Sequence, residues 1–298
     1  MSEFSYSWVM LSTAPKIIRL GHSPDPDDAF MFYAFAKNKI DMKGFHVEHV
    51  VADIESLNQK ALRAELEVTA VSCHAYAYLA EQYAVMRSGA SVGDQYGPIL
   101  VAAQNGVLAG KAGKFSPADL RGKKVAVPGK LTTAYLALQL FEKDFKPVFT
   151  PFDRIFEAVS SRQVDLGLII HEGQLTYQQK GYQNVLDLGV WWFERHGLPL
   201  PLGIDVIRRD LGEEAMRSFS ALFKKSIQYA LDHRAPALEY AREFGRGISE
   251  NLNDRFVGMY VNDDTVDLDA KGQAGLRTLL QEGHTQGLLP RLIVPEFI

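Results

Sequence analysis

The chain alternates short apolar runs with longer segments that have helical periodicity. In its first part, the apolar runs predict strands, and segments with apolar residues three or four positions apart predict helices. The predicted strands are 17–20, 45–51 and 68–72, and the predicted helices that follow them are 27–37, 54–64 and 74–83. This β-α-β-α-β-α order joins parallel strands by right-handed helical crossovers, so it predicts an open, layered α/β sheet.

A second series of elements begins after the apolar run 97–103. It consists of a predicted strand at 123–127, helices at 132–145 and 153–161, and a strand at 164–170 whose unbroken apolar pattern is typical of a buried position. A further strand is predicted at 202–208, and the later periodic segments are all helical, at 213–233, 235–245, 249–257 and 268–287. The pattern therefore predicts two α/β lobes and a helix-rich tail.

The length of 298 residues is about twice that of a usual ~150-residue domain, which also favours two lobes. No repeat or proline-rich linker separates them, so we expect two extended connections, at 97–108 and 198–206. We predict a first, larger lobe of residues 1–104 plus 205–298 and a second, smaller lobe of residues 105–204. A chain that leaves one lobe, builds the other and returns has a type II periplasmic-binding-protein-like layout: an α/β fold with a double crossover and an interdomain cleft that binds ligand.

Composition and charge exclude several classes of protein. Hydrophobic residues make up 47% and charged residues 23% of the chain, which is ordinary for a globular protein that folds throughout. The net charge is −4 and the basic residues are scattered, so nucleic acid is not expected as a partner. The single cysteine, Cys73, excludes an intramolecular disulfide and a cysteine-based metal site.

The N-terminal residues do not match a signal peptide. The apolar stretch 8–11 is shorter than the ~7–15 residues that such a peptide requires, and Glu3 stands where a positive charge belongs. No window approaches the ~18 uninterrupted apolar residues of a membrane span. We therefore expect a soluble, cytoplasmic protein without a membrane partner, in which residues 1–14 are a loose extension.

Several short motifs fail when their context is considered. The run G-A-S-V-G at 89–93 matches a nucleophile elbow, but a strand-like run follows where a helix is needed, so a glycine-rich turn is favoured. A phosphate loop near Gly129 lacks its first glycine, and no G-x-G-x-x-G follows the first strand. The eight histidines form no H-x-x-x-H pair on a helix. No metal and no cofactor are predicted.

Four segments lie where a predicted strand ends and a helix begins, which is the ligand-binding edge of an open α/β sheet. The first, 21–30, contains Ser23 and Asp28, and its aspartates also suit helix capping. The second, 71–74, contains Ser72, which offers a hydroxyl and a backbone N–H and is equally suited to be an N-cap. His22 and His74 lie in these segments and are interpreted as structural or cleft-lining.

The other two segments belong to the second lobe. In 127–134, Thr132 and Thr133 open a helix behind Gly129, an arrangement that suits a carboxylate because N–H groups and hydroxyls are available at a helix N-terminus. In 168–177, His171 ends the most apolar strand, where an imidazole can transfer protons at neutral pH. We therefore expect a small carboxylate-bearing substrate that the two threonines hold. His171 is the expected reactive group, which transfers a proton. The oligomeric state is left open.

These segments also resemble a known family, the 1,4-dihydroxy-6-naphthoate synthases of the futalosine route to menaquinone. The likeness covers most of residues 17–210. Its motifs are S-P-D-P-D-D-A-F-M-F at 23–32, S-G-A-S-V-G-D-Q-Y-G-P at 88–98, P-G-K-L-T-T-A at 128–134, I-H-E-G-Q-L-T-Y at 170–177, and D-L-G-V-W-W with G-L-P-L-P-L-G within 187–203.

The resemblance implies a periplasmic-binding-protein-like fold and a cofactor-independent lyase. The implied reaction converts cyclic dehypoxanthine futalosine into 1,4-dihydroxy-6-naphthoate with loss of a sugar-derived fragment. It further implies that His171 is the general base, that Thr132 and Thr133 contact substrate, and that Ser72 occupies the matching serine position of the first lobe.

The first motif departs from the family form S-P-C-P-N-D-T, because Asp25, Asp27 and Ala29 replace its Cys, Asn and Thr. Only Ser23 and Asp28 transfer directly as substrate-binding residues. Two other functions share the fold and a carboxylate ligand: a solute-binding protein, which would need a secretory signal, and chorismate dehydratase, whose motifs are not seen.

Overall fold

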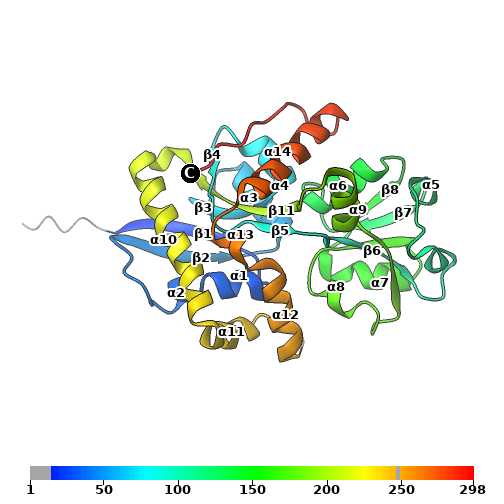
Figure 1. The fold of residues 1–298 in the computed structure, drawn as a ribbon, viewed down its shortest axis with the longest axis horizontal. Coiled ribbons are helices and arrows are strands. Elements are labelled where there is room, and N and C mark those ends of the chain that lie inside the picture. The colour runs from blue at the N-terminus through cyan, green and yellow to red at the C-terminus, as the bar shows by residue number, and fades with distance from the viewer. Residues whose placement is uncertain (1–14, 246–248) are drawn as a thin grey trace, which may run out of the picture.

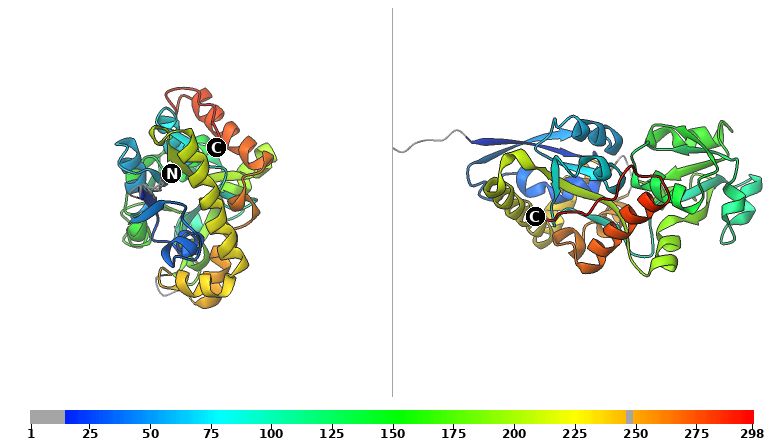
Figure 2. Two further views of the ribbon diagram at one scale, coloured as in Figure 1. Left: turned by 90° about the vertical axis from the view of Figure 1, so that its left-hand side faces the viewer. Right: turned by 90° about the horizontal axis from the view of Figure 1, so that it is seen from above.

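Two β-sheets organise the chain, side by side along the long axis of the molecule (Figures 1 and 2). The structure is a computed structural model that describes residues 15–245 and 249–298. The predicted extension 1–14 lies outside these residues. The order of the strands shows that the chain leaves the first sheet once, builds the second, and returns.

The first sheet has the strand order β2-β1-β3-β11-β4, and β5 also pairs with β11. Its strands are β1 (Lys16–His22), β2 (Phe45–Val51), β3 (Val68–Ser72), β4 (Tyr83–Val85), β5 (Ser91–Gly93) and β11 (Leu200–Arg208). As predicted, β1, β2 and β3 are parallel. The returning strand β11 runs antiparallel to β3, β4 and β5.

The second sheet has the order β10-β6-β9-β7-β8. Its strands are β6 (Ile99–Ala103), β7 (Lys124–Val127), β8 (Lys146–Phe149), β9 (Leu166–Ile169) and β10 (Tyr182–Asp187). Strands β7, β8 and β9 are parallel, whereas β6 is antiparallel to β9 and β10. We call each sheet with its helices a lobe. Because β6 belongs to the second sheet, that sheet begins before residue 105, and the predicted domain limits stay a prediction.

Helices cover both faces of the first sheet (Figure 1). One face carries α1 (Pro26–Met31), α2 (Tyr33–Ala36), α10 (Glu213–Asp232), α11 (Arg234–Arg242) and α12 (Glu250–Tyr260). Their apolar side chains, including Phe30, Phe32, Phe219 and Phe223, form one core with Val68 and Ile207 of the sheet. The other face carries α3 (Ile54–Leu62), α4 (Cys73–Leu79) and α14 (Ala270–Thr285). The short α13 (Asp263–Val266) precedes α14.

The second lobe contains α5 (Pro117–Leu120), α6 (Thr133–Phe141), α7 (Ile155–Ser160), α8 (Gly173–Thr176) and α9 (Leu188–His196). Single 3-10 turns lie at Val107–Lys111, Phe152–Arg154 and Arg209–Leu211. Helix α6 contacts α4, α14 and β11 of the first lobe. One apolar core therefore continues from the second face of the first sheet into the second lobe.

The chain crosses between the sheets at 94–98 and at 188–199, both earlier than the expected 97–108 and 198–206, and these two connections pack against each other. The amide of Leu188 donates to the carbonyl of Pro98 over 3.0 Å. A side chain at Gly189 would collide with the Tyr96 carbonyl, and one at Gly97 would come within 2.9 Å of the Gly189 nitrogen. Both glycines are thus required by close approach of backbone to backbone.

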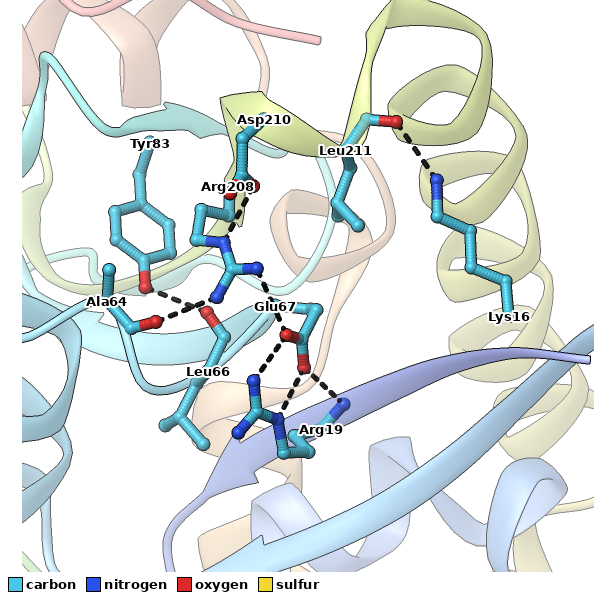
Figure 3. Close-up of polar contacts among 9 residues, drawn as sticks. All are labelled: Lys16, Arg19, Ala64, Leu66, Glu67, Tyr83, Arg208, Asp210 and Leu211. Atoms are coloured by element: carbon cyan, nitrogen blue, oxygen red, sulfur yellow. Dashed lines mark hydrogen bonds and ion pairs between the residues drawn. The ribbon is translucent and has the colours of Figure 1, made fainter.

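Ionic contacts fix the first sheet at the start of β3 (Figure 3). The buried Glu67 carboxylate accepts hydrogen bonds from Arg19 at Nε over 2.8 Å and at Nη2 over 2.6 Å, and pairs with Arg208 over 3.2 Å. Burial alone would raise the pKa of Glu67, but the Arg19 hydrogen bonds outweigh it and the pKa is lowered. This network joins β1, β3 and β11 at the end of β3 away from Ser72.

Most predicted elements are present, with corrections at their ends. The predicted helix 27–37 is two short helices, which meet at Phe32. The predicted helix 132–145 ends at Phe141, and the predicted helix 74–83 ends at Leu79, after which Tyr83–Val85 forms a strand. The run at 89–93 contains strand β5 and is followed by no helix, in agreement with a turn and against a nucleophile elbow.

Candidate functional site

A cavity of about 130 Å³ lies where the two lobes meet. Its wall includes the predicted residues Ser23, Asp28, Ser72, Thr132 and Thr133. Each of them follows a strand and precedes or opens a helix, as the sequence pattern predicted. The remaining predicted residue, His171, lies beside a smaller adjoining cavity of about 30 Å³.

The N-terminus of α6 lies at the wall of the larger cavity. Thr132 is its N-cap: the hydroxyl accepts from the Tyr135 amide over 3.2 Å and donates to the Gly129 carbonyl over 3.1 Å. The hydroxyl of Thr133 donates to the Leu202 carbonyl over 2.5 Å. Among the described residues, no acceptor bonds to the amides of Thr133 and Ala134, which both line the cavity. The free donors of this site are therefore backbone N–H groups, and the hydroxyls hold the loop in shape.

Ser72 is the N-cap of α4 and is held by Asn58. Its amide donates to Asn58 Oδ1 over 2.9 Å, and its hydroxyl oxygen accepts from Asn58 Nδ2 over 3.3 Å. The backbone N–H that the sequence interpretation offered to a ligand is consequently occupied. The hydroxyl hydrogen is the donor that Ser72 can direct to a ligand.

The loop between β1 and α1 is closed by its own side chains. The Ser23 amide donates to Asp28 Oδ2 over 2.5 Å, and the Ser23 hydroxyl donates to Asp25 Oδ2 over 3.0 Å. Burial raises the pKa of Asp28 to about 7, although the Ser23 amide opposes this shift. Burial, reinforced by the charges of Asp28 and Asp25, raises the pKa of Asp27 as well. This loop contributes weakly acidic carboxyl groups to the cavity.

His171 follows β9 and is buried, with both ring nitrogens engaged. Nδ1 accepts from the Gly173 amide over 3.0 Å, so Nε2 carries the proton and donates to the Phe152 carbonyl over 3.2 Å. Glu172 Oε2 lies 3.5 Å from Nδ1. The ring also meets Phe152 edge to face, with 5.3 Å between the ring centroids. Nδ1 is therefore the basic nitrogen, and a carboxylate stands beside it.

The two cavities share part of their walls. Asp25, Ile54 and Ile170 line both cavities, so the two adjoin. The structure thus brings the threonines, serines and Asp28 together around one cavity and places His171 at the neighbouring one.

His22 and His74 have structural partners. His22 Nε2 lies 3.0 Å from His49 Nδ1, and His74 Nδ1 lies 3.3 Å from the Thr132 carbonyl. Burial lowers the pKa of each to about 4. Neither residue lines the cavities described above, in agreement with a structural interpretation.

Sequence reasoning did not single out several residues of the cavity wall, among them Gln174, Asp205 and Tyr260. The Tyr260 hydroxyl, from α12, donates to Gln174 Oε1 of α8 over 3.0 Å. Asp205 lies within β11, where it is indistinguishable in sequence from an ordinary polar strand residue. Gln174 had a signal, because it belongs to the I-H-E-G-Q motif. The helical tail thus contributes to the site through Phe256 and Tyr260.

The described residues contain neither a candidate metal site nor a helix that could span a membrane. Within residues 15–245 and 249–298, no group of three or more His, Cys, Asp or Glu side chains could hold a metal ion. In the same ranges, no helix has the length and apolar character needed to cross a membrane.

Comparison with known proteins gives consistent matches over nearly the whole chain. A family model described as menaquinone biosynthesis matches residues 18–285. A protein of Thermus thermophilus named 1,4-dihydroxy-6-naphthoate synthase is 39% identical over 281 residues, which cover 94% of this chain and 99% of that protein. A similarly named protein of Streptomyces coelicolor is 34% identical and covers 92% and 95%.

Solved structures agree on the fold. A crystal structure of an Archaeoglobus fulgidus protein is 47% identical with a TM-score of 0.84, covering 91% of this chain and 98% of that one. The alkanesulfonate-binding protein SsuA of Xanthomonas axonopodis, bound to MOPS, is 12% identical with a TM-score of 0.70 and covers 95% and 97%. The second likeness shows the fold alone, which is that of periplasmic binding proteins, as predicted.

Proposed function

The chain belongs to the menaquinone-biosynthesis family of 1,4-dihydroxy-6-naphthoate synthases, and from that membership we propose that it is a cofactor-independent lyase acting on cyclic dehypoxanthine futalosine. The product is 1,4-dihydroxy-6-naphthoate, and a sugar-derived fragment is lost. We place the reaction in the cytoplasm, in keeping with a chain whose one cysteine is a free, buried thiol.

The observation that carries the proposal is the N-terminus of α6, with two unbonded amides facing a cavity between the lobes. The aromatic carboxylate of the substrate binds these amides, where the helix dipole adds roughly 0.3–1 kcal/mol. The hydroxyl of Ser72 and the Ser23–Asp28 loop contact the rest of the molecule. Thr132 and Thr133 act mainly by holding the loop that presents the amides.

His171 is the general base of the proposed reaction. Its Nδ1 carries the lone pair, and the Glu172 carboxylate, 3.5 Å away, stabilises the imidazolium that forms when Nδ1 takes a proton. Removal of that proton starts a retro-aldol or eliminative fragmentation. Nδ1 also accepts from the Gly173 amide, and His171 lines the smaller cavity and not the larger one. The substrate must therefore extend into the smaller cavity and displace this hydrogen bond to reach Nδ1.

The decisive experiment is incubation of the purified protein with cyclic dehypoxanthine futalosine and, separately, with chorismate, followed by mass analysis of the products. We expect the mass of 1,4-dihydroxy-6-naphthoate from the first substrate and no change in the second. Dehydration of chorismate, or binding of either acid without turnover, would contradict the proposal and indicate the sister enzyme or a solute-binding protein.

A further inference from the structure

Asp205 is a buried carboxyl group that the mechanism above does not use. It lies in the middle of β11, has 1% of its surface exposed, and lines the larger cavity. In the part of the chain that the structure describes, its Oδ1 has no hydrogen-bond partner, and no cation pairs with it. A buried polar atom without a partner is costly, so its presence at a cavity wall points to a partner supplied by the ligand.

The backbone is shaped to leave room for this carboxyl group. Gly89 has a φ of +93°, and a side chain there would collide with Asp205 Oδ2 and with the ring of Phe223. Gly89 and Ser91 line the same cavity. The glycine-rich turn at 89–93, which had no role in the proposed chemistry, therefore packs directly against Asp205.

The surroundings favour the neutral form of Asp205. Burial, and after it the charge of Asp28, raise the pKa of Asp205 well above its ordinary value. A neutral carboxyl group both donates and accepts a hydrogen bond, which suits a hydroxyl group. An anionic group of the ligand is disfavoured beside Asp205, because the carboxyl groups of Asp27 and Asp28 line the same cavity. A metal ion would need more ligands than this wall provides.

Distance along β11 separates Asp205 from the carboxylate end of the cavity. Thr133 contacts the carbonyl of Leu202 on the same strand. Three residues further along, Asp205 lies about 10 Å away, since a strand rises roughly 3.4 Å per residue. A ligand held at α6 by its carboxylate can therefore reach Asp205 with a group at its other end.

We propose that Asp205 determines specificity by binding a neutral hydroxyl group of the substrate, on the part of the molecule that is lost in the reaction. This inference rests on the proposed function, because it assigns the far end of the same ligand. The product keeps the carboxylate but lacks that part, so Asp205 discriminates between substrate and product.

The test compares three readouts for the purified enzyme and its variants: kcat/KM for cyclic dehypoxanthine futalosine, the inhibition constant of 1,4-dihydroxy-6-naphthoate, and Tm. In Asp205→Ala we expect kcat/KM to fall 10–100-fold, while product inhibition changes less than twofold. Asp205→Asn, a neutral group of the same shape that donates and accepts, should keep kcat/KM within about fivefold of the wild type. If Asp205→Ala does not fold, Asp205→Val replaces it and should show the same fall in kcat/KM and the same small change in product inhibition.

Three outcomes for the variants would overturn the inference while leaving the proposed function intact. Unchanged kcat/KM in Asp205→Ala would show that the group has no role. An equal loss of substrate and product binding would show general damage to the cavity. A loss in Asp205→Asn as large as in Asp205→Ala would show that the negative charge matters and that the partner is a cation. Failure of the wild type to convert the substrate would refute the proposed function itself, and the inference with it.

Discussion

At the residue scale, the sequence predicted those site residues that lie in loops after strands. Ser23, Ser72, Thr132 and His171 could be found because each lies where a predicted strand gives way to a predicted helix. Asp205 and Tyr260 could not, because one lies within a strand and the other within a helix, and their patterns are those of ordinary surface or core positions. Only the return of β11 between β3 and β4 brings Asp205 to the cavity.

The proposed role of His171 as general base predicts a large effect of its removal. In His171→Asn the amide oxygen can still accept from the Gly173 amide, as Nδ1 does, but it cannot take a proton. We expect turnover to fall ~100-fold or more, with Tm within a few degrees of the wild type. His196→Asn, on α9 and away from both cavities, is the matched control and should keep its activity. Near-normal turnover of His171→Asn would return this histidine to a structural role.

The buried Asp28 predicts that stability falls as pH rises. Its pKa is about 7 in the folded protein against an ordinary 3.8, so between these values the folded state binds more protons than the unfolded state. The free energy of unfolding should therefore decrease from pH 4 to pH 7, by up to about 4 kcal/mol from this group, as each unit corresponds to 1.36 kcal/mol. Urea unfolding at pH 4.5, 6 and 8 measures this slope. Asp28→Asn should show a smaller decrease, and parallel slopes for the two proteins would contradict the expectation.

At the element scale, the sequence predicted strands that alternate with clearly periodic helices and missed the short strands β4 and β5 and the edge strands β8 and β10. β2 and β3 have the predicted limits, because both lie between helices with clear periodicity. β8, in contrast, is exposed at all four positions and contains Pro147, as an edge strand can, so it has no alternating pattern. β10 is the other edge of that sheet and was missed as well.

The contact between the two connections predicts an effect of one added methyl group. In Gly189→Ala the new Cβ collides with the backbone carbonyl of Tyr96, which cannot move aside without shifting the connection. We expect a loss of ~1–3 kcal/mol of stability, as for other overpacked sites. Gly110→Ala, where no atom lies within 4 Å, is the control and should unfold like the wild type. Thermal and urea unfolding of both variants provide the comparison, and equal stability would mean that the connections yield easily.

At the scale of the whole molecule, the layout followed from the order of elements, but the contacts between the lobes did not. The alternation of strands and helices indicated two α/β lobes, and the two sheets have separate strands with a single excursion of the chain. Nothing in the sequence indicated that α12, in the helical tail, would bond to α8 in the other lobe through Tyr260 and Gln174. Such contacts depend on side chains far apart in sequence that meet only after both lobes have formed.

The hydrogen bond between Tyr260 and Gln174 joins the two lobes at the cavity, so its removal should weaken substrate binding. Tyr260→Phe removes the hydroxyl and leaves Gln174 Oε1 without this donor, at a cost of ~1–3 kcal/mol in the joined state. We expect KM to rise several-fold, with kcat less affected. Steady-state kinetics of the variant beside Tyr229→Phe, a tyrosine of α10 that does not line the cavity, would test this. An unchanged KM would show that the contact is not needed for binding.

Cys73 is the one cysteine of the chain; it is fully buried at the start of α4, and burial raises the pKa of its thiol to about 12. Maleimides and methanethiosulfonates react with thiolates, so the wild-type protein already offers a silent background for labelling. Ser218→Cys on α10 and Ala118→Cys on α5 would place one spin label on each lobe at exposed positions. Double electron–electron resonance between the labels would then report the separation of the lobes in solution, before and after substrate is added, without replacement of the native cysteine.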